Sequence, residues 1–285
     1  VLREVMSFGI RSPYMKSGDN QEKFESAVTY SSYLSVDELL ELQKPRSNGP
    51  EHDEMLFIIV HQTYELWFKC VLHELARAQS LLETGDTHGS LPVLGRVRTI
   101  FKVLVSQVDI LETMTPLQFN SFRDRLEAAS GFQSVQFREL EAVLGRRDTT
   151  MVDHLDPKSQ ARLRVSGAMN RPSLWDSVII YLEQHGHKMP DEVTKRNVAE
   201  NYVANDRVQE SLAVAYRQDP QVAMLLERLL DIDEGLQEWR YRHVKMVERT
   251  IGLKHGTGGS SGAAYLATTL FKPVFPDLWA VRSRF

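Results

Sequence analysis

The sequence predicts an all-helical, bundle-like fold, because apolar residues recur at helical spacing in several long segments. The clearest segment is 222–251, where two interleaved series of period seven form one apolar stripe. The series are Val222, Leu229, Leu236, His243 and Thr250, and Leu225, Ile232, Trp239 and Met246. We find no convincing run of alternating apolar and polar residues, which is the pattern of strands. Packed helices are therefore expected throughout.

A second long helix is predicted over 52–83. Its first turn carries Asp53 and Glu54, which suit the positive end of a helix dipole. We assign its inward face to one series of helical spacing: His52, Leu56, Ile59, Thr63, Leu66 and Cys70. This assignment puts His52 at the start of the helix, where its side chain can face a cavity. His61 and His73, further along, are then expected to be structural.

Further helices are predicted over 94–111, 172–186 and 191–218. Residues 145–220 as a whole are less regular, and we expect a small helical excursion outside the main core. Residues 1–43 are expected to form an N-terminal arm with a short helix. Residues 44–285 are expected to form a single helical domain.

Composition narrows the class of protein. The 285 residues are 42% hydrophobic and 25% charged, which is ordinary for a soluble globular protein. A formal net charge of −4 gives no support to a nucleic-acid or membrane-surface partner, and no uninterrupted apolar run spans a bilayer. Cys70 is the only cysteine, so an intrachain disulfide, a thiolate zinc cluster and a CxxCH haem attachment are excluded. We expect a cytoplasmic protein in which any haem is held non-covalently.

Three features are candidates for a functional site. His243 lies within an apolar stripe, where it is either a core histidine bonded to a carbonyl or an axial ligand of a metal or haem. Arg123 and Arg138 each adjoin phenylalanines, and arginine beside a desolvated pocket grips carboxylates well. The glycine-rich loop 256–262 is either a linker or a lid. An apolar segment follows it, so the loop is tethered at both ends, which favours a lid.

Five motifs together resemble the tryptophan 2,3-dioxygenase family of haem enzymes. They are TYSSYL, HDEMLFIIVHQTYELWFK, FRDRLEAASGFQSVQFRELE, WRYRHVKMVERTIGLKHGTGGSSG and FPDLWAVR, and they extend from about Thr29 to the C-terminus. The resemblance implies an all-helical haem domain that uses non-covalent haem b, one per subunit, and O2. It also implies a homotetramer built from dimers, with the N-terminal arm reaching into the neighbouring active site.

The resemblance further implies roles for individual residues. His243 matches the proximal iron ligand, His52 the distal histidine, and Arg123 the arginine that pairs with the substrate carboxylate. Thr257 matches a threonine that holds the amino-acid end of the substrate, and Arg138 a position near the haem propionates. The expected walls of the substrate pocket are Tyr30, Tyr33, Leu34, Phe119 and Ser130.

Two positions vary from the family pattern. Phe119 stands where some members have tyrosine, and His255 adds a titratable group beside the glycine loop. The implied reaction is the opening of the indole C2–C3 bond of L-tryptophan by O2, which gives N-formylkynurenine. One alternative is a relative that acts on a substituted tryptophan as a monooxygenase in secondary metabolism. Another is a haem-binding sensor, which would need His243 but neither Arg123 nor Thr257.

Overall fold

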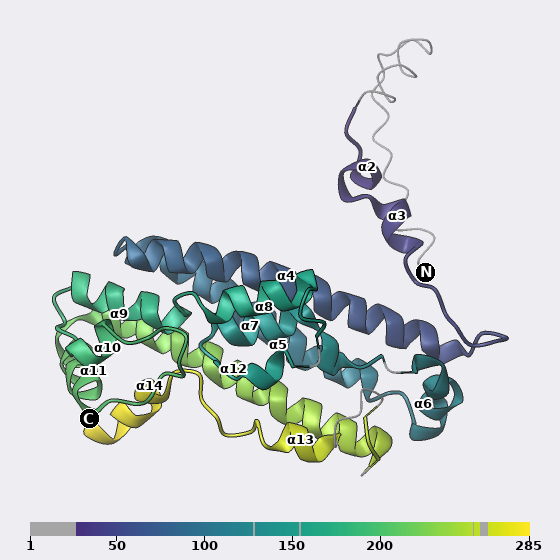
Figure 1. Cartoon of the computed structure of the whole chain (residues 1–285). Coiled ribbons are helices and arrows are strands. Elements are labelled where there is room, and N and C mark those ends of the chain that lie inside the picture. The colour runs from purple at the N-terminus through teal and green to yellow at the C-terminus, as the bar shows by residue number, and fades with distance from the viewer. Residues whose placement is uncertain (1–26, 128, 154, 253, 257–261) are drawn as a thin grey trace, which may run out of the picture. The chain divides into compact units, whose positions relative to one another are not determined.

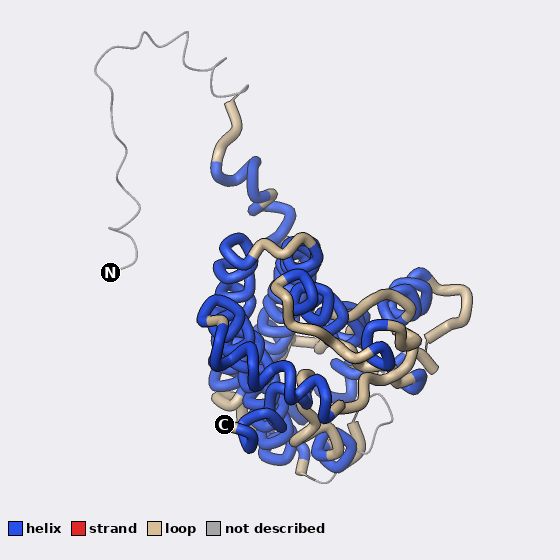
Figure 2. The backbone as a smooth tube through the Cα atoms, turned by 90° about the vertical axis from the view of Figure 1, so that its left-hand side faces the viewer, coloured by secondary structure: helices blue, strands red, loops and turns tan. Residues whose placement is uncertain are grey.

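The computed structural model describes residues 27–127, 129–153, 155–252, 254–256 and 262–285, and it confirms the all-helical class. Within these residues every regular element is a helix (Figure 2). The longer helices are α4 (His52–Glu83), α5 (Thr87–Leu111), α6 (Pro116–Arg123), α7 (Val135–Val143), α8 (Gln160–Met169), α9 (Leu174–Gln184), α11 (Asp206–Gln218) and α12 (Pro220–Ile251). The shorter ones are α2 (Tyr30–Leu34), α3 (Val36–Leu40), α10 (Asp191–Thr194), α13 (Ala263–Ala267) and α14 (Pro276–Ala280). Short 3₁₀ turns are η1 (Asp124–Leu126), η2 (Gly131–Gln133), η3 (Thr149–Met151) and η4 (Val281–Arg284).

The chain forms two separate compact units, residues 1–44 and 45–285. The described part of the first unit contains α2 and α3 and no buried side chain. Thr29 and Ser32 form a capping box at the start of α2, which satisfies backbone donors locally. The second unit contains the hydrophobic core and every cavity discussed below.

Three long helices, α4, α5 and α12, pack against one another and form the centre of the second unit (Figure 1). The predicted stripe of α12 is buried as expected from Val222 to Trp239, at 9% exposure or less. Helix α9 packs on one end of α4, and α7, covered by α8, packs further along it. A long apolar surface is thereby removed from water, which is the main stabilising term of such a bundle.

The predicted inward face of α4 is wrong. Three residues of the predicted series are exposed: His52, Ile59 (43% exposed) and Leu66 (52% exposed). The face that enters the core is displaced around the helix and contains Val60, Tyr64, Phe68, Val71, Leu75 and Leu82. Both series have helical spacing, so the pattern alone did not separate them. Packing against α5 and α9 decides between them.

The predicted helix over 191–218 is also wrong in its centre. It is two helices, α10 and α11, joined by an irregular stretch over 195–205. The side chain of Asn205 caps α11 by accepting from the amides of Arg207 and Val208, which starts a new helix. Arg196, in the irregular stretch, forms an ion pair with Asp176 on α9 at 2.8 Å.

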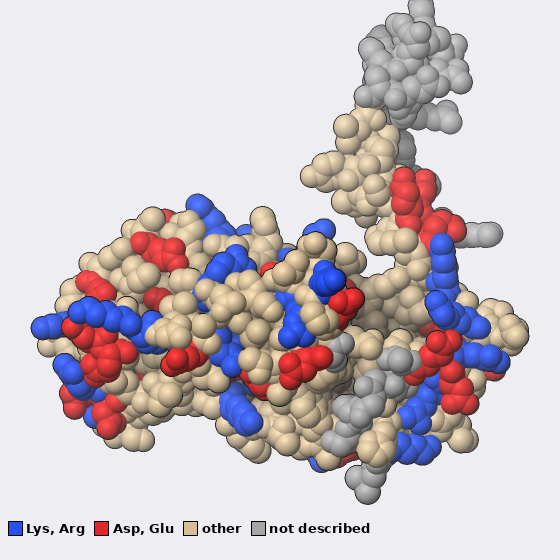
Figure 3. All heavy atoms as spheres, in the orientation of Figure 1, with Lys and Arg blue, Asp and Glu red and all other residues tan. Residues whose placement is uncertain are grey.

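Within the described residues α4 is the helix whose length and composition would allow it to cross a membrane. An 18-residue window of it has a mean hydropathy of 1.2, and 17% of that window is buried. The same helix supplies Val71, Leu75 and Leu82 to the core at 0% exposure. On the face shown in Figure 3, basic and acidic side chains are interspersed over the helical unit.

The C-terminal segment is held to α12 by the carboxylate of Asp233, which is fully buried. It accepts hydrogen bonds from the backbone amides of Val274 and Phe275, at 2.8 and 3.0 Å, and from the indole of Trp279 at 2.9 Å. One buried carboxylate thus satisfies three donors of the C-terminal segment. It sets where Phe275 and Leu278 enter the core.

We expect Asp233→Ala to destabilise the fold by about 2–4 kcal/mol, because it leaves three buried or partly buried donors without their acceptor. Urea unfolding followed by circular dichroism measures this as a lower midpoint at an unchanged slope. The matched control is the exposed neighbour Glu234→Ala, for which we expect a change under about 0.5 kcal/mol. Equal effects of the two substitutions would contradict this account of Asp233.

Candidate functional site

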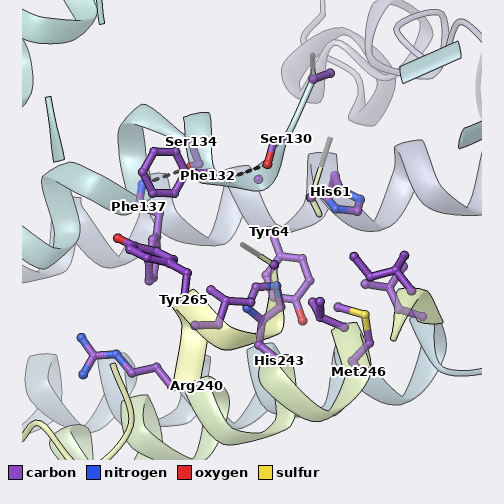
Figure 4. A pocket seen from close by; sticks show the side chains of 18 of the residues that line it. His61, Tyr64, Ser130, Phe132, Ser134, Phe137, Arg240, His243, Met246 and Tyr265 are labelled. Atoms are coloured by element: carbon purple, nitrogen blue, oxygen red, sulfur yellow. Dashed lines mark hydrogen bonds between the residues drawn. The ribbon is translucent and has the colours of Figure 1, made fainter. Parts of the chain in front are cut away.

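A cavity of about 290 Å³, the first cavity, lies between α4, α6, α7, α12 and α13. Its lining is mainly apolar and aromatic, with a few polar groups directed inward (Figure 4). Pockets that bind small molecules typically have this composition. The polar groups come from four helices that are far apart in the sequence, so the cavity exists only in the folded chain.

His243 forms part of the α12 wall of the first cavity. Its ring stacks on the indole of Trp239, with centroids 5.1 Å apart and planes 9° apart. Among the described residues it makes no hydrogen bond, and it keeps accessible surface only because its ring faces the cavity. Burial, with smaller contributions from His61 and Arg138, lowers the pKa of His243 to about 4. The imidazole is therefore neutral at pH 7, so a ring nitrogen is free to act as a ligand.

His61 projects from α4 into the same cavity (Figure 4). Its Nδ1 lies 2.7 Å from the carbonyl oxygen of Phe57, and a carbonyl can only accept, so Nδ1 carries the proton. Nε2 is left as the basic nitrogen. The rings of His61 and Phe57 are in contact, with centroids 4.1 Å apart and planes tilted by 37°, which restricts the His61 ring. Burial lowers the pKa of His61, and the Phe57 carbonyl and the Glu65 carboxylate oppose that shift.

The structure does not bring His52 to the cavity. His52 is the first residue of α4, is exposed, and does not line the cavity, whereas His61 does. The expectation that His52 faces the site and His61 is structural is therefore wrong. Its cause is the misassigned face of α4, since the two histidines are nine residues, or two and a half turns, apart and so lie on opposite sides of the helix. A second series of helical spacing in the sequence predicts this face: Phe57, Val60, Tyr64 and Phe68. His61 adjoins that series, so choosing it would have predicted His61 at the cavity.

Arg123 lies at the cavity, at the C-terminal end of α6. One Nη donates to the backbone carbonyl of His255 at 2.7 Å, so α6 is tied to the segment after α12. Capping by Thr115 and the proline at the helix start set the position of α6. Phe119, buried on the same helix, packs on Phe57 with centroids 5.7 Å apart. A guanidinium beside an aromatic wall can bind an aromatic amino acid by its carboxylate and its ring.

Ser130 also lines the cavity. Its oxygen accepts a hydrogen bond from the amide of Phe132 at 3.3 Å and caps η2, which leaves the hydroxyl proton available. The next serine, Ser134, caps α7 and donates to Glu65 on α4 at 2.5 Å. The polypeptide between η2 and α7 is thereby fixed to the helix that carries His61.

Arg138 lines the first cavity as part of a buried cluster of charges around Glu141. Glu141 accepts from Arg138 at 2.5 Å and from Arg146 at 2.8 Å, and lies 3.5 Å from Arg240. Arg146 also pairs with Asp148 at 2.8 Å. Three guanidiniums and two carboxylates leave one uncompensated positive charge beside the cavity. Burial of such a charge is costly unless an anion accompanies it.

The glycine-rich loop reaches the cavity through Gly256 and Gly262. Gly262 has φ +62°, and a Cβ on it would lie 2.8 Å from the backbone oxygen of Lys254, so only glycine fits this turn. Thr257 lies outside the described residues. Tyr30, Tyr33 and Leu34 belong to the separate N-terminal unit and are 78%, 78% and 46% exposed.

Within the described part of the chain, no group of three or more His, Cys, Asp or Glu side chains could hold a metal ion.

Comparison with known proteins gives consistent results. The family model of tryptophan 2,3-dioxygenase matches residues 15–224 and 212–285. The chain is 57% identical to the tryptophan 2,3-dioxygenase of Herpetosiphon aurantiacus over 90% of this chain and 98% of that protein. It is 58% identical to that of Anaeromyxobacter sp. strain K over 90% and 96%, and 43% identical to that of Caulobacter vibrioides over 90% and 98%.

The lowered pKa of His243 predicts a pH dependence of stability in the cofactor-free protein. A histidine whose pKa falls on folding takes up a proton more readily when unfolded, so its stabilising contribution is complete above pH 6.5. That contribution is lost as the pH falls towards 4, by about 3 kcal/mol in total. Unfolding free energies at pH 7 and pH 4.5 should therefore differ less in His243→Leu than in the unsubstituted chain. The exposed His73→Leu should leave the difference unchanged.

Proposed function

Because the chain belongs to the tryptophan 2,3-dioxygenase family, we propose that it opens the indole C2–C3 bond of L-tryptophan with O2 and gives N-formylkynurenine. The observation that carries this proposal is the first cavity, where His243, His61 and Arg123 converge on an aromatic space. A neutral ligand histidine, a base and a carboxylate-binding cation are the groups this reaction needs. Three helices, α12, α4 and α6, hold them in fixed positions.

The residues of the first cavity fit haem b. His243 offers a neutral imidazole that has no hydrogen-bond partner among the described residues, and Trp239 holds its plane. Aromatic and aliphatic side chains from α4, α7 and α12 match an apolar macrocycle. The cluster around Glu141 includes Arg138 and carries an uncompensated positive charge. This charge would attract the negatively charged haem propionates. His243 would thus be the axial ligand, with one non-covalent haem per chain.

Substrate binding is assigned to residues of α4 and α6 and the glycine loop. Arg123 would hold the carboxylate, with Thr257 of the loop at the amino-acid end. The indole would lie against Phe57 and Phe119, with the hydroxyl of Ser130 nearby. The Nε2 of His61 is placed to accept the indole N–H, because Nδ1 is already committed to the Phe57 carbonyl. A base held in one tautomer orients the ring without a reorganisation cost.

When bound, ferrous haem would supply the binding and activation of O2. The chain contributes positioning and exclusion of water. Contact with the Phe57 ring restricts His61, and the hydrogen bond from Ser134 to Glu65 fixes the start of α7 to the helix that carries His61. With Arg123 at the amino-acid end and His61 at the indole nitrogen, the substrate has two anchors, which define the orientation of its C2–C3 bond.

We also propose a cytoplasmic homotetramer, a dimer of dimers without nucleic-acid or membrane partners, in which the arm of residues 1–43 covers the neighbouring site. In the described part of the arm the apolar side chains Val28, Tyr30, Tyr33, Leu34, Leu40 and Leu42 are 46% exposed or more. Since none of its described residues is buried, the arm would gain stability by burying this surface on another chain. Tyr30, Tyr33 and Leu34 would then complete the aromatic wall of the partner's cavity.

We expect His61→Ala to lower kcat by at least tenfold, because it removes the group that orients the indole nitrogen. His52→Ala, at the exposed start of α4, should keep kcat within twofold. Steady-state kinetics on both haem-loaded variants gives the comparison. A large loss in His52→Ala with normal turnover in His61→Ala would reverse the assignment made from the structure.

We expect Arg123→Ala to raise KM for L-tryptophan at least 30-fold, because losing a charged partner of a carboxylate in a desolvated pocket costs about 2–5 kcal/mol. Arg125→Ala, two residues on and exposed, is the matched control and should leave KM within twofold. An unchanged KM in Arg123→Ala would mean that another group binds the carboxylate.

The proposed reaction is tested by turning over reduced, haem-loaded protein with L-tryptophan under ¹⁸O₂ and weighing the product by mass spectrometry. Two labelled oxygens in a ring-opened product are expected. A single labelled oxygen would identify a monooxygenase instead. A protein that takes up no haem would contradict the proposal altogether.

A further inference from the structure

A second cavity, of about 620 Å³, lies beside the first, between the segment 141–149, the start of α9 and the segment 265–276. Glu141, Arg240, Tyr265 and Thr269 line both cavities, so they form a shared wall. The proposed dioxygenase reaction uses none of the remaining lining of the second cavity. Its volume lies within the range typical of small-molecule sites.

The second cavity has an excess of positive charge. Its cationic lining residues are Arg146, Arg147, Arg240 and Lys272, and its acidic ones are Glu141 and Asp148. Four cations against two carboxylates leave a formal excess of two positive charges. Low-dielectric walls strengthen the field of such an excess inside a cavity, which favours an anion as occupant.

The ion pairs show where this excess is located. Arg146 and Arg240 share the carboxylate of Glu141, so their charge is largely compensated. The guanidinium of Arg147 is 7% exposed and donates only to backbone carbonyls, those of Ala142, Arg146, Arg171 and Val198. Arg147 is therefore a fixed charge that forms no ion pair with any described residue, and the nearby carboxylate of Asp176 is already paired with Arg196. The ammonium group of Lys272 makes no hydrogen bond or ion pair with any described residue and is exposed, which leaves it free to bind.

The rest of the lining determines what kind of anion fits. Trp175, Leu236, Pro273, Val274 and Pro276 form an apolar side. The hydroxyls of Thr149, Ser173 and Thr268 lie around the same space. A bare inorganic ion would leave the apolar surface in contact with water. An organic carboxylate with a ring-sized apolar body would use both halves of the cavity.

We propose that the second cavity is a binding site for an organic carboxylate, distinct from the first cavity, in which Lys272 contacts the carboxylate and Arg147 supplies a fixed positive field. The carboxylate is that of a free small molecule with a ring-sized apolar body. The proposal does not depend on the dioxygenase reaction, since it concerns binding alone.

The test is calorimetric titration of 3-phenylpropionate into the full-length protein, with and without haem. The titration is repeated on Arg123→Ala, which removes the proposed carboxylate anchor of the first cavity, so that binding that persists in this variant is binding outside the first cavity. We expect one site per chain, with an affinity that falls as salt rises, and at least tenfold weaker binding of the neutral analogue 3-phenylpropionamide. Binding to both forms is expected of a site that is separate from the haem. Binding to the haem-free form alone would contradict a site distinct from the first cavity.

Two variants of exposed lining residues locate the site. Lys272→Glu should weaken binding at least tenfold by reversing the free charge, and Thr268→Trp should weaken it by filling the space. The control Lys158→Glu makes the same charge change at an exposed position outside the cavity and should leave the affinity unchanged. The proposal is overturned if neither form of the protein binds the probe, or if Lys272→Glu and Lys158→Glu bind it equally well.

Discussion

The close packing of α12 against α5 is the contact on which the rest of the helical unit depends. At Gly235 a Cβ would lie 3.3 Å from the Cβ of Phe101, so the absence of a side chain allows the two helices to approach closely there. On either side of this point the stripe of α12 is buried, and α4 completes the contact on the other side of α5. The position of His243, two turns beyond Gly235, follows from this packing.

The same stripe changes its role along its length. Up to Trp239 its side chains fill the core, whereas His243 and Met246 face the first cavity. The change occurs where α4, α6 and α7 diverge enough to leave a space lined by aromatic rings. A core position thereby becomes a ligand position without any change in helical periodicity. The rigidity needed at the site comes from the packed part of the same helix.

Buried charge separates the two cavities. Glu141 holds three guanidiniums together, and their mutual repulsion is tolerated because one carboxylate serves all three. The net positive charge that remains favours anions on both sides of the wall. For the first cavity this matches the propionates of the proposed cofactor, and for the second it matches the proposed carboxylate.

The sequence alone determined the helical class, the extents of α4 and α12, and the stripe containing His243. Helical periodicity is a local property, so each segment shows it independently of the rest of the fold. The family motifs also selected Arg123, Ser130 and Arg138, which the tertiary structure places at one cavity. Only the tertiary structure decided which face of α4 is inward, and so put His61 rather than His52 at the cavity. It also decided that 191–218 forms two helices, and that a cluster around Glu141 divides two cavities. These outcomes depend on contacts between distant segments, and two equally good stripes on one helix are distinguished only by the helices that pack against them.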